Sequence, residues 1–309
     1  MKAVTTLSKR LARGDVVFMD GGVSTEIQRQ GVAMDSRVWS GIAHMEHPDI
    51  VRKVHESYIR AGAEVITANT FATARHLLEA KGLGEQFEEI NRRAVEIARE
   101  ARDNAAEGAV WIAGSIASTL VFERGQGSTR GEAVLQNYRD QAAIYAEAGA
   151  DLIVLEMMID IEGSIPCAEA AVASGLPVWV GFSASLRDGA VIGYREGDPE
   201  GVPVVDFAEI VDAILAIGGD AAGVMHSLID STAPALEVLA ERFEGPRFVY
   251  AETGQWRSPE WVFEQVVSPE DYATVVEGWV KEQGVQIIGG CCGTGPEHIR
   301  ALKERFAGV

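Results

Sequence analysis

Short apolar segments rich in β-branched residues recur along the chain, and amphipathic segments separate them. Because such short runs are typical of buried strands, the sequence predicts eight strands, at residues 16–22, 64–71, 110–116, 151–157, 177–184, 220–227, 247–254 and 285–293. Between them, apolar residues recur every three or four positions, as in PDIVRKVHESYIRAGA (48–63), which is typical of helices. Several of these segments end in Ala-Gly-Ala or Gly-Gly, as helix C-caps do.

Strands that alternate with helices in this way are the pattern of a (β/α)8 TIM barrel, a fold that typically needs roughly 250 residues. A doubly wound open sheet is the alternative. No linker interrupts the alternation, and the stretches at 123–131 and 186–203, which contain Gly and Pro, each follow a predicted strand and are interpreted as βα loops. We therefore predict a single barrel domain over residues 1–309.

The net charge of the chain limits which kinds of molecule it can bind. The chain has 46 acidic and 27 basic residues, a formal net charge of −19, which repels nucleic-acid phosphates and anionic membrane surfaces. No apolar run approaches the ~20 residues of a membrane span, and the N-terminal MKAVTTLSKRLARGD lacks the apolar core of a secretory signal. We expect a cytoplasmic protein with small-molecule partners, and the sequence leaves open whether it forms a homo-oligomer.

Polar side chains collect at the ends of the predicted strands, where the active sites of (β/α)8 barrels lie. The two carboxylates in this set, Asp20 and Glu156, could serve as acid and base, hold an ammonium group or pair with arginine, and spacing alone does not choose. The full set comprises Asp20, Asn69, Thr70, Ser115, Glu156, Ser183, His226, Glu252, Cys291 and Cys292.

Two of the three cysteines are adjacent, in IIGGCCGTGPEHI (287–299). A catalytic zinc site needs three protein ligands and an open position, and His226 ends the sixth predicted strand, whose inward residues share a layer with those of the eighth. The sequence thus predicts Zn²⁺ bound by His226, Cys291 and Cys292, provided that the backbone curls at the flanking glycines so that both thiols converge. Alternatively, the cysteines are small buried hydrophobes and His226 a hydrogen-bonded core residue.

Several motifs together resemble the homocysteine S-methyltransferase family. They are FMDGGVSTEIQRQG (18–31), VWSGIAHMEHPDIVRKVHESYIRAGAEVITANTF (38–71), GSI (114–116), the strand that carries Glu156, and IIGGCCGTGPEHI. The resemblance covers essentially the whole chain. That family is similar to betaine–homocysteine methyltransferases and to the homocysteine module of cobalamin-dependent methionine synthases, which share the (β/α)8 fold.

The resemblance implies an enzyme in which zinc holds homocysteine as a thiolate, which attacks the methyl group of an onium donor such as S-methylmethionine and gives methionine. It further implies that Asp20 and Glu156 hold the homocysteine ammonium group, and that Thr70 and the backbone of Gly21 help to fix the amino acid. On the loops after the first and seventh predicted strands, two tryptophans are candidates for cation–π contacts with the donor; they are Trp39 and Trp256.

The sequence also departs from the family pattern. Where members usually carry Asn-Cys at the end of the sixth strand, this chain has Met225-His226. A site with one histidine and two cysteines carries one negative charge fewer than a site with three cysteines, so we expect a less nucleophilic substrate thiolate. Two further differences, ASTLVFERGQGS (117–128) after GSI and AETG (251–254) after the seventh strand, leave the methyl donor unspecified.

Other functions remain open at this level. The acceptor could be another thiol, or the methyl group could come from a corrinoid protein. A non-catalytic binding or regulatory protein on the same barrel is a further alternative, although replacement of a cysteine by another metal ligand argues against it. Hydrolase and aldolase barrels are disfavoured because no lysine ends a predicted strand and no serine has an evident histidine partner.

Overall fold

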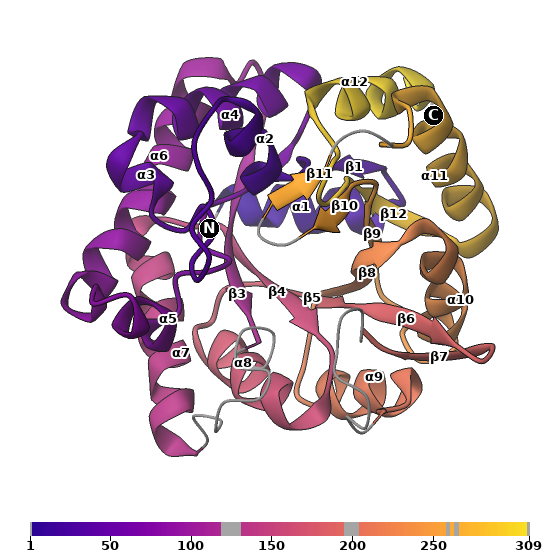
Figure 1. Ribbon diagram of the computed structural model, residues 1–309. Helices are drawn as coiled ribbons and strands as arrows, with labels where there is room; N and C mark the ends of the chain where they lie inside the picture. Colours follow the sequence, from indigo (N-terminus) through magenta and orange to yellow (C-terminus); the bar gives the residue numbers. More distant parts are fainter. Residues whose placement is uncertain (1, 119–130, 195–203, 258–259, 263–265, 308–309) are drawn as a thin grey trace.

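The structure is a computed structural model of the 309-residue chain, and it describes residues 2–118, 131–194, 204–257, 260–262 and 266–307. Eight parallel strands form one sheet in the order β1-β12-β9-β8-β5-β4-β3-β2. A parallel bridge between Met19 and Val65 joins the first strand of this order to the last. Two backbone hydrogen bonds support that junction, from Asp20 N to Val65 O (3.0 Å) and from Glu64 N to Phe18 O (2.7 Å). The sheet is therefore a closed barrel, which confirms the predicted (β/α)8 fold and excludes the open sheet (Figure 1).

Each predicted strand segment overlaps one strand of the barrel, and three strands, β3, β4 and β8, extend one residue beyond the predicted end. Their bounds are β1 (Val17–Phe18), β2 (Val65–Thr67), β3 (Trp111–Ala117), β4 (Leu152–Met158), β5 (Val178–Phe182), β8 (Ala221–Leu228), β9 (Arg247–Glu252) and β12 (Val285–Ile288). Most of their residues are buried because helices cover the outer face and packed side chains fill the interior. This double burial explains why the strands appear in the sequence as nearly continuous apolar runs.

Helices form the outer ring of the barrel (Figure 1). Three of them end at a glycine in the left-handed conformation, Gly62 (φ 112°), Gly149 (φ 91°) and Gly284 (φ 64°). The first two stand in the Ala-Gly-Ala sequences that predicted C-caps, whereas the helix before Gly218-Gly219 has Ala216 as its C-cap. The helices that follow the N-terminal one are α2 (Val23–Arg29), α3 (Ala43–Glu46), α4 (Pro48–Ala61), α5 (Arg75–Ala80), α6 (Phe87–Ala105), α7 (Glu132–Ala148), α8 (Ile161–Ala173), α9 (Phe207–Leu215), α10 (Ile229–Ala240), α11 (Pro269–Gln283) and α12 (Pro296–Arg305), with a 3₁₀ turn, η1, at Gly84–Gln86.

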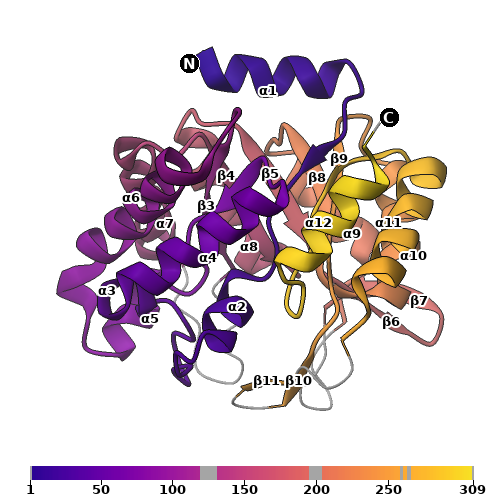
Figure 2. The same cartoon turned by 90° about the horizontal axis from the view of Figure 1, so that it is seen from above.

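The N-terminal helix α1 (Lys2–Ala12) lies across the end of the barrel at which the strands begin (Figure 2). Its Leu7 and Leu11 are buried in the same cluster as the interior residues Trp111 and Trp179. Arg10 fixes the helix to the barrel through an ion pair with Glu64, 2.8 Å between Nη1 and Oε1. The N-terminal end of the barrel is thus closed by a helix that the sequence analysis did not predict.

Two antiparallel hairpins extend from the opposite end. One consists of β6 (Ala184–Arg187) and β7 (Ala190–Gly193), and the other of β10 (Gln255–Arg257) and β11 (Glu260–Val262). The first belongs to the connection between β5 and α9, which includes the predicted βα loop at 186–203; residues 195–203 lie outside the described part of the chain. Of the other predicted loop, 123–131, only Gly131 is described. Among the described residues, no helix combines the length and apolarity needed to cross a membrane.

Candidate metal centre and substrate pocket

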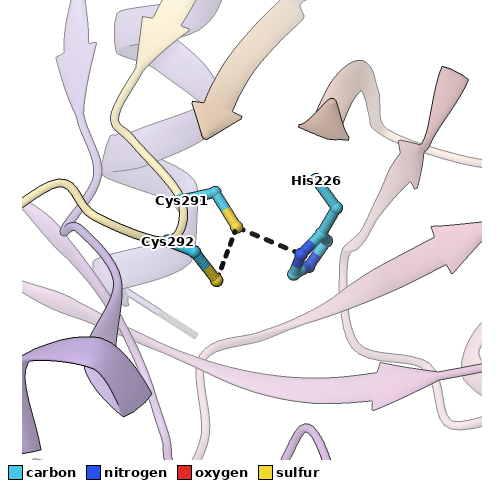
Figure 3. Close-up of side chains that lie close together, drawn as sticks. All are labelled: His226, Cys291 and Cys292. Atoms are coloured by element: carbon cyan, nitrogen blue, oxygen red, sulfur yellow. Dashed lines mark hydrogen bonds between the residues drawn. The ribbon is translucent and has the colours of Figure 1, made fainter. Parts of the chain in front are cut away.

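Two thiols and one imidazole converge at the C-terminal end of the barrel. His226 lies in β8, whereas Cys291 and Cys292 lie in the turn that follows β12. The Sγ atom of Cys291 lies 3.0 Å from Nδ1 of His226 and 3.6 Å from Sγ of Cys292 (Figure 3). One ligand atom from each residue can be chosen so that all three lie within 4.8 Å of one another. Within the described part of the chain, this is the group of histidine, cysteine and acidic side chains close enough together to hold one ion.

The glycines around the cysteine pair have different roles. Gly293 has φ 88°, a left-handed conformation that reverses the chain directly after Cys292. Gly289 and Gly290 allow close packing instead, because a Cβ at Gly289 would lie 2.7 Å from that of Met19 and one at Gly290 would overlap the Thr294 side chain. The sequence predicts that the backbone curls at all three glycines, Gly289, Gly290 and Gly293. In the structure, Gly293 alone of the three has a left-handed conformation, and both cysteines lie beyond the end of β12.

Backbone hydrogen bonds fix the two cysteines against the end of β9. The N–H of Cys291 donates to Ala251 O (2.8 Å), and the carbonyl of Cys292 accepts from Thr253 N (2.9 Å) and Gly254 N (3.0 Å). Both cysteines are buried, with 2% and 8% of their surface exposed. Burial, together with the neighbouring Cys292, raises the pKa of the Cys291 thiol well above its ordinary value. A bound metal ion would reverse this direction, because coordination deprotonates a thiol.

His226 is held from three sides. Its Nε2 lies 2.7 Å from Oε2 of Glu156, its Nδ1 faces Cys291, and its ring stacks on Phe71 with 5.2 Å between the centroids. Its φ of 46° is left-handed, a conformation that few non-glycine residues adopt. Burial acts to lower the pKa of His226, but the contacts with Cys291 and Glu156 outweigh it and raise the pKa well above the ordinary value.

The predicted ammonium ligand Asp20 is fully buried beside the site. Its carboxylate accepts hydrogen bonds from Thr67 N (2.7 Å), Thr67 Oγ1 (3.2 Å) and the Tyr250 hydroxyl (3.0 Å). Burial raises the pKa of Asp20 to about 7, although these hydrogen bonds act in the opposite direction. The Tyr250 hydroxyl also approaches the carbonyl of Gly21, at 2.6 Å.

A pocket opens beside the three ligand side chains. The Trp39 indole stacks on Phe71 with 5.3 Å between the centroids, so that Trp39, Phe71 and His226 form one continuous aromatic stack. The pocket is lined by Gly22, Val23, Ser24, Trp39, Thr67, Ala68, Asn69, Phe71, Glu156, His226, Tyr250, Cys291 and Cys292. The structure therefore gathers Glu156, Trp39 and the metal-ligand candidates around one space, with Asp20 and Gly21 directly behind Tyr250.

Two predicted site residues, Thr70 and Trp256, are not among the described residues that line this pocket. The Thr70 hydroxyl accepts from Ser115 N (3.0 Å) and approaches Ser115 O (3.1 Å), which ties the end of β2 to β3, and Thr70 does not line the pocket. Trp256 pairs with Trp261 in the β10–β11 hairpin, and its side chain lies outside the described part of the structure. Glu252, at the end of β9, is buried but does not belong to the three-residue ligand group.

Sequence analysis missed three residues that shape the site: Thr67, Phe71 and Tyr250. Thr67 lies two residues before Asn69 and Tyr250 two residues before Glu252, so strand alternation, which puts such pairs on one face, could have indicated them. Phe71 belongs to the predicted strand 64–71 but lies beyond the end of β2, in a turn, so strand alternation does not indicate its direction.

The donor set suits zinc. Thiolates and imidazole are the ligands that zinc prefers, and three of them beside an open pocket are the arrangement of a catalytic rather than a structural site. The fold and this site together define a class, (β/α)8 barrels with a candidate metal site of two thiols and one imidazole at the C-terminal ends of the strands.

A comparison of the chain with models of known protein families identifies its family. The family model described as homocysteine S-methyltransferase matches residues 17–306, so the chain belongs to this family. The protein is accordingly a methyltransferase.

Individual relatives resemble the chain over most of its length. The selenocysteine Se-methyltransferase of Brassica oleracea var. italica is 28% identical and covers 95% of this chain, which covers 89% of that protein. Homocysteine S-methyltransferase YbgG of Bacillus subtilis (strain 168) is 27% identical, with 93% of each chain covered. The metallated form of the homocysteine methyltransferase MmuM from Escherichia coli superimposes with a TM-score of 0.74 at 26% identity, covering 94% of this chain and 96% of that one.

Proposed function

We propose that the protein transfers a methyl group from an onium donor, such as S-methylmethionine, to the sulfur of L-homocysteine and gives methionine, with Zn²⁺ held by His226, Cys291 and Cys292. One observation carries this proposal: an imidazole nitrogen and two thiols converge within 4.8 Å beside a pocket in a chain of this family. Two of the relatives named above, YbgG and MmuM, are homocysteine methyltransferases, which supports the choice of acceptor.

When bound, zinc supplies a way to keep the acceptor sulfur deprotonated at neutral pH, since a free thiol has a pKa near ~8.5. The chain supplies the rest. Asp20 and Glu156 provide negative charge for the ammonium group of the acceptor, with Gly21 and Thr70 proposed to help fix the amino acid. A new C–S bond forms at the acceptor while the methyl–onium bond breaks, and its electron pair stays with the donor, which leaves as a neutral molecule.

The walls of the pocket favour this reaction. A cation and a thiolate neutralise each other as the methyl group moves, so a site that excludes water favours the transition state over the separated ions. Trp39 and Phe71 present aromatic surface beside His226, and we assign Trp39 and Trp256 to the donor, where a ring face attracts an onium cation. We also place the protein in the cytoplasm, in line with three cysteines that are all free.

Metal stoichiometry is the first test. Protein loaded with zinc and desalted should retain about one zinc ion per chain, measured by plasma mass spectrometry, and the Cys291→Ser/Cys292→Ser variant should retain almost none. The loaded enzyme is then assayed with L-homocysteine or L-selenocysteine against S-methylmethionine, betaine and S-adenosylmethionine. The proposal would be contradicted if the wild type retained no zinc after loading and desalting, or if the zinc-loaded protein methylated no thiol.

A further inference from the structure

The contact between His226 and Glu156 joins two strands that are not neighbours. Glu156 lies in β4 and His226 in β8, with β5 between them in the sheet. Nevertheless Nε2 and Oε2 lie 2.7 Å apart, and the two side chains are only 13% and 7% exposed. A charge-assisted hydrogen bond of this length in a buried site is among the strong ones.

The protein distorts both strands where this contact forms. Met157, next to Glu156, has φ 58°, and His226 has φ 46°. The pairing register shifts at the same places, between Leu155 and Met158 in β4 and between Met225 and Leu228 in β8. Non-glycine residues in the left-handed region cost free energy, and they persist where the surrounding structure holds a functional arrangement. The paired distortions therefore point to the His226–Glu156 contact as a built feature.

The hydrogen bond determines which nitrogen faces the thiols. An ionised carboxylate can only accept, so Nε2 of His226 must carry the proton that it donates to Glu156. In the neutral imidazole, the form that binds a metal ion, the other nitrogen, Nδ1, then has the free lone pair, and it is the atom that lies 3.0 Å from Cys291 Sγ. Histidine ligands of metals are generally fixed in tautomer and direction by such an acceptor on the second nitrogen.

We infer that Glu156 is a positioning residue for the metal ligand His226: it holds Nε2–H so that Nδ1 is the coordinating nitrogen. This inference rests on the proposed zinc site but assigns Glu156 a task beyond the ammonium group of the acceptor. The task exists because this chain has histidine at position 226. A cysteine there would have no second nitrogen for Glu156 to hold.

The test measures zinc affinity without either substrate, by competition with a chromophoric chelator. Loss of an acceptor of this kind typically weakens metal binding by about 10- to 100-fold, and we expect Glu156→Ala to fall in that range and Glu156→Gln to lose less, because an amide oxygen can still accept. Glu169→Gln, which removes an equal charge from an exposed position in α8, should bind zinc as the wild type does.

A double-mutant cycle separates orientation from the simple attraction between a carboxylate and a cation. In the His226→Cys background, the substitution Glu156→Ala should change zinc affinity by no more than about twofold. An equal loss in both backgrounds, or no loss in either, would overturn the inference.

A direct measurement keeps the inference testable if Glu156→Ala folds poorly. Nitrogen-15 NMR of the zinc-loaded wild type should show Nδ1 of His226 bound to metal and Nε2 protonated, and metal on Nε2 would refute the inference. Failure of the proposed function would look different, because the wild type would then bind no zinc or transfer no methyl group, whereas failure of this inference leaves both intact.

Discussion

The phenyl ring of Phe71 lies against the imidazole of His226, with 5.2 Å between the ring centroids and 29° between the ring planes. This contact orients the imidazole from the face, whereas Glu156 and Cys291 contact its edge.

Replacing Phe71 by leucine removes the stacking while keeping an apolar side chain. Aromatic pairs contribute about 0.5–1.5 kcal/mol beyond area burial, so we expect kcat/KM for methyl transfer to fall roughly 2- to 10-fold with zinc stoichiometry unchanged. Phe306→Leu, far from the site in the contact with Phe18, serves as the control and should leave kcat/KM unchanged. Equal kcat/KM for wild type and Phe71→Leu would contradict the prediction.

The substitution His226→Cys tests the effect of ligand charge. A third thiolate makes the site more negative and the acceptor sulfur a better nucleophile, so single-turnover methyl transfer should become faster by about tenfold, the effect of about 1.4 kcal/mol in the barrier. Rapid quench with isotope-labelled donor measures the step apart from product release. Unchanged single-turnover rates would show that the imidazole does not limit nucleophilicity.

Titration of the Asp20 carboxyl group makes the free energy of unfolding of the substrate-free protein depend on pH. Its folded-state pKa of about 7 lies above the ordinary value of 3.8, so the protonated form is favoured by folding. The stabilising contribution is complete below pH 3.8 and is lost as the pH rises through about 7. Asp20→Asn should therefore gain stability relative to the wild type between pH 4 and 7, measured by urea unfolding. A constant difference across this range would argue against a raised pKa.

Titration of His55, in α4, gives the stability the opposite pH dependence, a loss as the pH falls. Burial, and to a lesser extent His44, lowers the pKa of His55 to about 4, and neither ring nitrogen has a hydrogen-bond partner among the described residues. The contribution of neutral His55 is present above pH 6.5 and is lost as the pH falls through about 4.

We expect His55→Phe to raise the free energy of unfolding at pH 7 by roughly 1–3 kcal/mol, the cost of a buried unpaired polar group. The difference from the wild type should grow between pH 6.5 and 4, because phenylalanine does not titrate. His47→Phe, at a residue outside the core, is the control. A less stable His55→Phe protein would indicate that the site cannot accept the larger ring.

The order of strands and helices could be predicted because each barrel strand is buried on both faces and each helix on one, which leaves strong patterns in the sequence. The β6–β7 hairpin also carries a signal, since Asp188-Gly189 suits a two-residue turn with two positive φ angles, 51° and 82°. The helix α1 carries only a weak signal, because two apolar residues four positions apart, Leu7 and Leu11, bury it against the barrel.

The candidate site was predictable only in part. The cysteine pair and His226 stand at strand ends, and barrel geometry brings strand ends together. The contact between Glu156 and His226 had no such signal, because it depends on left-handed backbone at Met157 and His226. Methionine does not favour that conformation, and histidine, although enriched there among non-glycine residues, still adopts it rarely, so tertiary packing rather than local preference determines it.

The helix α1 also constrains the kinetics. Leu7 and Leu11 pack against the apolar barrel interior, so that α1 covers the N-terminal end of the barrel, and we expect both substrates to enter at the opposite end, where the pocket lies. The acceptor sulfur has to reach the buried Cys291 and Cys292 before the donor fills the space above it. We therefore expect a compulsory binding order in which homocysteine enters first and its methylated product leaves last. With betaine as the donor, whose own product is not methionine, methionine should inhibit competitively toward homocysteine alone.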